Sequence, residues 1–353
     1  MKQLLILVLF GYLLSCNSAL GENVKAELDK AYGKAVAGDV RPILSFLDSI
    51  EDVNKSQFAE LHGKYKQRFI TADERMEFDD PFITNLYAHY TAYWSSSLLD
   101  PENERVSRKI LVSKLNELSK KEGRKAGLLE AFRGPSIDKL ETFLIATARR
   151  KGYFVLMGRT FPLRELMIWK KEESEKYQVE LPSESFPVNV VFTQEFLSHG
   201  WLGYATFNRS HTGGWNVGDT IYRVGTKPGE DNEGFRVSIL GHEGRHILDK
   251  KLYGELNGWI LEYRAKLTEL LLAEESFWNR LKGFKNEAQD TPSIPHTYAS
   301  YRLLYDLIQE LSEEQEQMPF HSFRFESYSI EELKHAIELI LERSTKSLES
   351  NGP

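Results

Sequence analysis

Apolar residues recur at intervals of three and four along the first part of the chain, and this spacing predicts amphipathic helices. The predicted helices lie near residues 24–37, 39–50, 55–69, 81–99, 102–122 and 136–151. Asp80-Pro81 and Asp100-Pro101 each mark a helix start, because aspartate caps an N-terminus and proline fits the first turn. The aromatic residues between Tyr87 and Trp94 predict core packing. We therefore expect residues 17–150 to form a helical cap or scaffold without a catalytic site.

Near residue 153 the pattern changes to short alternating or apolar runs, which predict strands at 153–157, 166–170, 177–181 and 188–192. The charged stretch 170–176 predicts an exposed hairpin turn between two of them. Residues 220–224 predict a further strand at the edge of the sheet. The sequence thus predicts a small antiparallel sheet in the middle of the chain.

Glycines and aromatic residues are interleaved between residues 198 and 218, with Trp201, Tyr204, Phe207 and Trp215 among glycines at 200, 203, 213, 214 and 218. Glycine permits tight turns and close backbone approach, and aromatic side chains can line pockets. A substrate cleft fits this composition, and an irregular loop packed on the core fits it equally.

The remaining segments again have helical spacing. They are residues 235–249, 259–273, 275–288, 298–311 and 330–348. The expected fold class is therefore α+β: a mainly helical first half, then a small sheet and a second set of helices. We expect residues 151–353 to form one domain that carries the chemistry.

The composition is that of an ordinary soluble globule, with 41% hydrophobic and 27% charged residues among 353. The formal net charge is −7. Nucleic-acid-binding domains are usually basic, so we expect no nucleic-acid partner.

The N-terminus has a different composition. Met1-Lys2-Gln3 precedes an apolar run at residues 4–14, which predicts a secretory signal and is too short to span a membrane. The run ends at Ser15-Cys16, and the sequence there resembles the bacterial lipoprotein processing site. Cys16 is the single cysteine, which excludes intramolecular disulfides. We expect residues 1–16 to be a signal peptide and a lipid on Cys16 to anchor the protein in the bacterial cell envelope, periplasmic or surface-facing. The alternative is an ordinary signal peptide cleaved near Ala19.

The strongest chemical pattern is His242-Glu243-Gly244-Arg245-His246, which has the form H-E-x-x-H. Two histidines four residues apart on a helix lie on one face and can reach the same Zn²⁺. Glu243 is then the general base for the water that the metal activates. The flanking residues are apolar, and a buried helix does not carry such groups without partners. The alternative is a pair of hydrogen-bonded core histidines.

A catalytic zinc usually takes a third protein ligand. The segment 259–273 predicts a second helix, on which Glu262, Ala265 and Glu269 share a face. The small Ala265 lets this helix pack closely, so Glu262 is the expected third ligand; its alternative role is that of a solvated surface glutamate. Asp249 is expected to be structural or to support a ligand through a hydrogen bond or a cation.

His242-Glu243-x-x-His246 followed by Glu262-x-x-Ala265 resembles the gluzincin class of zinc metallopeptidases. The resemblance covers roughly residues 150–275, which are also similar to uncharacterised bacterial metalloprotease-like proteins. It implies a strand-rich subdomain before the first helix and an edge strand that binds extended peptide. One departure is that no downstream residue matches the His or Tyr that many gluzincins use to stabilise the oxyanion. The candidates for that role are Tyr222, His211, Tyr298 and Tyr301.

The expected function is therefore that of a membrane-anchored zinc metallopeptidase with a peptide or protein substrate. A second hypothesis is an anchored scaffold or binding lipoprotein whose zinc site is structural or vestigial. A third is zinc-dependent hydrolysis of a non-peptide amide, for example in cell-wall material. The first two differ in the metal's fourth coordination position, which is open in a catalytic site and filled by protein in a structural one.

Overall fold

The computed structural model describes residues 6–10, 22–50, 52–71, 76–125, 135–229, 232–292, 294–312 and 320–351. The chain is α+β, as predicted. Its contacts divide it into two compact units. Unit 1 comprises Val8–Lys171 and Thr193–Gly213, unit 2 comprises Glu172–Phe192 and Gly214–Pro353, and residues 1–7 are divided between them.

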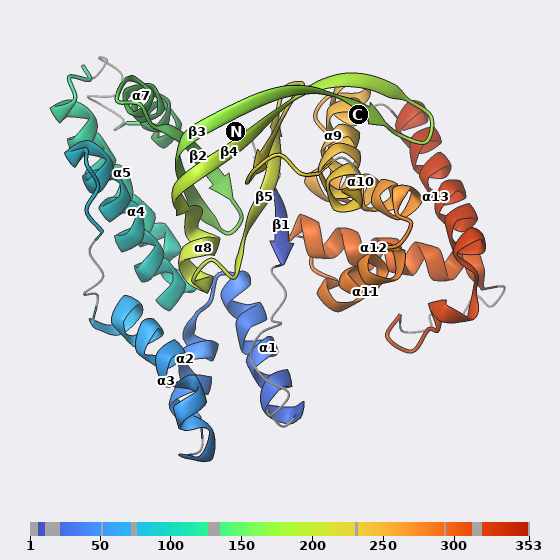
Figure 1. Cartoon of the computed structure of the whole chain (residues 1–353), viewed down its shortest axis with the longest axis horizontal. Helices are drawn as coiled ribbons and strands as arrows, with labels where there is room; N and C mark the ends of the chain where they lie inside the picture. The colour runs from blue at the N-terminus through green and yellow to red at the C-terminus, as the bar shows by residue number, and fades with distance from the viewer. Residues whose placement is uncertain are drawn as a thin grey trace. The chain divides into compact units, whose positions relative to one another are not determined.

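The helices of unit 1 before residue 151 confirm the predicted helical pattern. The described helices and helical turns of unit 1 are α1 (Glu22–Val36), α2 (Arg41–Ser49), α3 (Asp52–Lys66), the π-helical turn η1 (Gln67–Thr71), α4 (Pro81–Leu99), the 3-10 turn η2 (Pro101–Asn103), α5 (Glu104–Lys121), α7 (Ile137–Arg150) and α8 (Gly200–Thr206), of which α8 was not predicted. Helices α4 and α5 lie side by side (Figure 1). The predicted aromatic core is confirmed, because Tyr90 and Trp94 of α4 are fully buried.

The two predicted helix starts have different outcomes. Asp80 accepts hydrogen bonds from the backbone N–H groups of Phe82 and Ile83, so it caps α4 as expected. Asp100 makes no side-chain cap, and Pro101 begins the short turn η2 instead of a long helix. Helix α5 therefore begins three residues later than the sequence pattern indicates.

The strands form one sheet in the order β1-β5-β6-β4-β3-β2. Their bounds are β1 (Ile6–Phe10), β2 (Phe154–Thr160), β3 (Leu163–Glu180), β4 (Ser185–His199), β5 (Ser210–Val217) and β6 (Thr220–Val224). Strands β2 and β3 are antiparallel, as are β5 and β6. The sheet as a whole is mixed, so the predicted antiparallel sheet is wrong in this respect. Two neighbouring pairs, β1 with β5 and β4 with β6, are not consecutive in the chain, so the sheet contains crossovers that a succession of hairpins would lack.

Two detailed strand predictions are wrong. The expected turn at 170–176 lies inside β3, which is a single strand of 18 residues. Strand β6 is not at the edge, since β5 and β4 lie on either side of it. The turn between Val217 and Thr220 folds β6 back along β5, and β5 thereby takes the outer position of the pair.

The segment expected to be a cleft or a loop contains regular structure. Residues 200–206 form α8, and residues 210–224 form the β5–β6 hairpin. Trp201 and Trp215 are buried, at 4% and 1% exposure. Core packing therefore accounts for these two aromatic side chains.

The helices of unit 2 are also where the sequence predicts them. They are the π-helical segment η3 (Phe235–Gly241), α9 (His242–Tyr253), α10 (Gly258–Leu272), α11 (Phe277–Glu287), α12 (Pro295–Leu311), the 3-10 turn η4 (Phe325–Ser327) and α13 (Ile330–Asn351). Helix α10 packs against α9, α12 and α13, and it lies beside α9 in Figure 1. Its residues 261–270 are all buried, so α10 is the central helix of this unit.

The expected lipid-bearing Cys16 lies outside the described residues. Five residues of the apolar run before it form β1. Among the helices that the structure describes, none is both long enough and apolar enough to cross a membrane.

A buried carboxyl group in unit 1 provides a test of the fold. Glu165 of β3 accepts hydrogen bonds from the Thr160 hydroxyl at 2.7 Å and from the backbone N–H groups of Leu166 and Trp201 at 3.0 Å. Gly200 has a φ of +80°, and a Cβ there would lie 1.8 Å from a Glu165 oxygen. Glycine is therefore required at position 200 both by the backbone conformation and by the closeness of the carboxyl group.

Burial raises the pKa of Glu165 to about 7, from 4.5, although its hydrogen bonds act in the opposite direction. The unfolded chain therefore loses this proton first as the pH rises, and the contribution of Glu165 to stability falls between about pH 4.5 and pH 7. At 1.36 kcal/mol per pKa unit, the loss is about 3 kcal/mol. We expect Glu165→Gln to remove this pH-dependent loss of stability, because an amide does not titrate. The measurement is the free energy of unfolding in urea at pH 4.5 and pH 8. Equal pH dependence in wild type, Glu165→Gln and the exposed control Glu117→Gln would contradict the assignment.

Candidate metal centre

The two histidines of H-E-x-x-H lie in the first turns of α9, and the π-helical segment η3 leads directly into them. His242 and His246 are on the same face of the helix because they are four residues apart. Their Nε2 atoms are 3.1 Å apart, and each side chain is 1% exposed. The predicted helix thus brings both imidazoles to one buried point.

Glu262 of α10 points to the same place. Its Oε2 lies 3.5 Å from His242 Nε2, and its Oε1 lies 3.6 Å from His246 Nε2. Ala265, one turn further along α10, is fully buried. A methyl group at this position fits the close packing of α10 that the sequence predicts.

The three side chains, hereafter the triad, have the spacing of metal ligands. Two atoms bound at about 2.0–2.1 Å to a tetrahedral zinc lie roughly 3.3–3.4 Å apart. The two Nε2 atoms are 3.1 Å apart, and Glu262 presents one oxygen to each of them, Oε2 at 3.5 Å from His242 and Oε1 at 3.6 Å from His246, so the donor set is suited to a metal ion. Within the residues that the structure describes, this is the only group of three or more His, Cys, Asp or Glu side chains with such spacing, and no fourth member joins it.

Two glycines next to the ligands allow the close packing around them. A Cβ on Gly241 would lie 2.5 Å from a methyl carbon of Leu272, and a Cβ on Gly244 would lie 2.5 Å from a methyl carbon of Val179. Leu272 is at the end of α10, and Val179 is on β3. The absence of side chains at Gly241 of η3 and Gly244 of α9 therefore lets α10 and β3 approach the triad histidines closely, at a cost of about 1 kcal/mol of helix propensity per glycine.

Glu269 fixes the orientation of the first histidine. Its Oε1 is 2.6 Å from His242 Nδ1, and its Oε2 accepts from Arg280 at 2.6 Å. The carboxylate accepts a hydrogen bond from Nδ1–H, which leaves Nε2 of His242 available to a metal. The sequence placed Glu269 on the face of Glu262 but did not reveal this role.

The site attracts positive charge. Burial by itself lowers the pKa of His242, but the hydrogen bonds and charges of Glu262 and Glu269 outweigh it and raise the pKa to about 10. Burial raises the pKa of Glu269, yet the hydrogen bond and charge of His242, together with Arg280, lower it to about 2. Glu262 is held well below its usual pKa in the same way, by His296 and the two triad histidines. A cation at this position is therefore favoured by charge as well as by geometry.

Glu243 is fully buried next to the first histidine. Its Oε2 accepts a hydrogen bond from the Asn216 amide at 2.6 Å, and Asn216 in turn accepts from Lys250 at 2.9 Å. Its other oxygen, Oε1, is buried with no hydrogen-bond partner among the described residues. A buried carboxylate oxygen without a partner costs free energy. The arrangement holds one oxygen and leaves the other without a partner among the described residues.

Asp249 connects α9 with α10. It pairs with Arg264 of α10 through two hydrogen bonds, of 2.7 and 3.1 Å, and both side chains are almost fully buried. Arg245 lies 3.7 Å away. Asp249 thus pairs with cations, as one of its two predicted roles requires, and no contact between it and a triad histidine is recorded.

The four oxyanion candidates lie in three places. Tyr222 of β6 stacks on Trp215 with ring centroids 5.2 Å apart, and Tyr298 packs against Trp259 of α10 at 5.4 Å. Tyr301 follows one turn after Tyr298 on α12. His211 belongs to unit 1 and packs against His199. None of these contacts involves the triad, so the oxyanion donor stays unassigned.

Two residues that the sequence did not single out also belong to the site. His296 of α12 contacts Glu262, and Asn216 of β5 contacts Glu243. Neither has a fixed spacing from H-E-x-x-H, so periodicity could not have revealed them. They are brought to the site by the packing of α12 on α10 and by the fold of the sheet.

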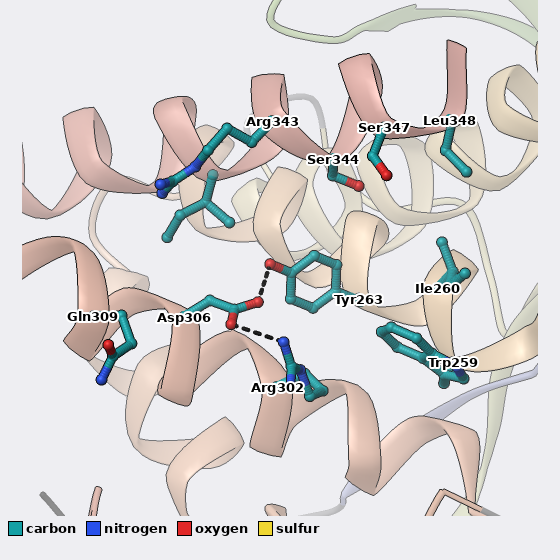
Figure 2. Close-up of a pocket in the computed structure, with 11 residues that line it drawn as sticks. Trp259, Ile260, Tyr263, Arg302, Asp306, Gln309, Arg343, Ser344, Ser347 and Leu348 are labelled. Carbon is teal, nitrogen blue, oxygen red and sulfur yellow. Dashed lines mark hydrogen bonds and ion pairs between the residues drawn. The ribbon is translucent and has the colours of Figure 1, made fainter. Parts of the chain in front are cut away.

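A separate cavity of about 420 Å³ lies among α10, α12 and α13. Figure 2 shows Asp306 in its middle, where it accepts hydrogen bonds from the hydroxyl of Tyr263 and from Arg302, with Trp259 nearby. None of the triad residues lines this cavity. It is therefore not the entrance to the metal centre.

No family model matches the chain, and no curated protein or solved structure is significantly similar to it. The metal centre therefore has to be interpreted from its own geometry.

Proposed function

We propose that this protein is a zinc-dependent hydrolase of peptide bonds with a zincin-like pair of helices. The observation that carries the proposal is that His242, His246 and Glu262 converge with the separations of a three-ligand metal site, with no fourth His, Cys, Asp or Glu from the described residues. Catalytic zinc sites characteristically take three protein ligands and keep one position open. The resemblance to gluzincins, through the same three residues, agrees with this interpretation.

The protein's own groups suit peptide hydrolysis. A zinc ion held by the triad would supply a positive charge that makes water a better nucleophile at neutral pH. Glu243, with one oxygen held by Asn216 and the other unpartnered, would accept a proton from the attacking water. It would then donate that proton to the amine that leaves. The proposal also includes a lipid anchor on Cys16 and a location in the cell envelope, which rest on the sequence alone.

A second candidate function is supported by the burial of the site. The triad side chains are 1 to 3% exposed, as the ligands of a structural zinc would be. In that case the protein would be an anchored scaffold or binding protein with a structural zinc. The two functions differ in whether an added ligand can reach the metal.

One experiment separates the two functions. The purified full chain is analysed for metal content, for cleavage of a mixed peptide library, and for binding of a peptide hydroxamate. We expect one zinc per chain, cleavage of peptides, and inhibition by the hydroxamate. One zinc per chain without cleavage and without hydroxamate binding would support the structural role. Absence of any bound metal would exclude both.

A further inference from the structure

His296 is the one additional side chain within hydrogen-bond distance of Glu262 in the described structure. It lies in the first turn of α12, and its Nδ1 is 2.8 Å from Glu262 Oε2. This oxygen is also the one nearer to His242 Nε2. His296 thus holds the carboxylate of the third proposed ligand from a different helix.

The second nitrogen of His296 determines which tautomer is present. Its Nε2 lies 3.3 Å from the ammonium group of Lys266. An ammonium group can only donate hydrogen bonds, so Nε2 must accept, and the imidazole hydrogen is on Nδ1. That hydrogen then points at Glu262, which can only accept. Both neighbours of His296 therefore select the same tautomer.

Lys266 is itself held in place by a partly buried partner. Its side chain is 1% exposed, and its ammonium group is 2.5 Å from Glu287 Oε1, which also accepts from the Ser300 hydroxyl at 2.6 Å. Glu287 Oε2 is 3.9 Å from His296 Nε2. Because the charge of Lys266 is compensated, the lysine can stay buried and donate to His296. The result is a continuous chain of polar contacts from α11 through α10 and α12 to the triad.

We propose that His296, oriented by Lys266, is a positioning residue of the metal centre: it holds the Glu262 carboxylate toward the two imidazoles before the metal arrives. The inference rests on the proposed zinc site. A free glutamate side chain loses rotamer entropy when it is fixed, and His296 provides this ordering in advance. Loss of such a supporting contact typically weakens metal binding about 10- to 100-fold.

The test compares two substitutions in the full-length protein. His296→Leu removes the donor, and we expect its zinc affinity, measured by competition with a chelator, to fall about 10- to 100-fold. His296→Asn keeps an N–H donor on a short side chain, so we expect its affinity to stay within about threefold of wild type. The absorption spectrum of the cobalt-substituted protein provides a second readout, and we expect it to change in His296→Leu only. His335→Leu, on the exposed surface of α13, is the matched control.

The outcomes distinguish this inference from the proposed function. If wild type binds zinc tightly and His296→Leu binds it equally well, His296 is not a positioning residue. If wild type binds no zinc, the metal centre itself is wrong and the inference falls with it. If His296→Leu does not fold, the tautomer of His296 in the wild-type zinc protein decides, by nitrogen NMR of the imidazole. Hydrogen on Nδ1 supports the proposal, and hydrogen on Nε2 overturns it.

Discussion

We expect Glu243→Gln to retain one zinc per chain and to lose about 10²- to 10⁴-fold in kcat, the usual contribution of a general base. Glutamine has nearly the same shape as glutamate, and its carbonyl oxygen can still accept the hydrogen bond from Asn216. The substitution therefore removes the ability to take a proton and leaves the packing of α9 in place. The measurement is turnover of a cleaved peptide, with zinc content determined on the same sample.

The matched control for this experiment is Glu255→Gln, an exposed glutamate that follows α9. It makes the same chemical change outside the site, so turnover should equal that of wild type. A Glu243→Gln protein that keeps its zinc and turns over within tenfold of wild type would remove Glu243 from the mechanism. Loss of zinc in this variant would instead show that Glu243 supports the metal site.

Local patterns predict the helices well, because the spacing of apolar residues within each helix is enough to locate it. The spacing of apolar residues locates α4 and α10, and the N-cap at Asp80 is confirmed at atomic level. The failure at residues 170–176 has a physical cause. This part of β3 is largely exposed, so it has no alternation that would reveal a strand. Pairing with a partner strand depends on the backbone, and the side-chain contact between Ser174 and Asn189 of β4 shows that the strand continues there.

The residues of the candidate site likewise differ in how well the sequence predicts them. The sequence locates His242 and His246 because helix geometry alone puts them together, and it locates Glu262 through one further assumption about helix packing. Asn216, Lys266 and His296 each reach the site through a fold that no short pattern encodes. The sequence also gives no sign that these residues are part of a site, since a lysine or an asparagine is most often a surface residue. Ligands with a fixed spacing are therefore predictable, and the residues that orient them are not.

We expect His246→Leu to remove most of the stabilisation by zinc while changing the stability of the metal-free protein little. In the structure, His246 Nε2 faces His242 and Glu262, while its Nδ1 is buried without a hydrogen-bond partner among the described residues. Such a nitrogen costs about 1–3 kcal/mol, which an apolar side chain of similar size avoids. The substitution also removes the contacts of His246 with Glu262 and His242, and their loss acts in the opposite direction. The metal-free variant should therefore unfold at about the same urea concentration as metal-free wild type.

Added zinc should make wild type more stable than the variant. A ligand at 1,000 times its Kd stabilises the folded state by about 4 kcal/mol, and wild type should show this gain in urea unfolding when zinc is added. The variant keeps two of three ligands. If about 10–16 kcal/mol of zinc binding is shared among four coordination positions, each contributes roughly 2.5–4 kcal/mol, or about 10²- to 10³-fold in affinity. At the same zinc concentration the variant should therefore gain only about 0.4–1.4 kcal/mol, and it should not hydrolyse peptide. The matched control is His335→Leu, which should respond to zinc as wild type does. Two results together would contradict the metal site: His246→Leu strongly destabilises the metal-free protein, and zinc stabilises neither wild type nor the variant. The two histidines would then be a hydrogen-bonded core pair that stabilises the fold without a metal.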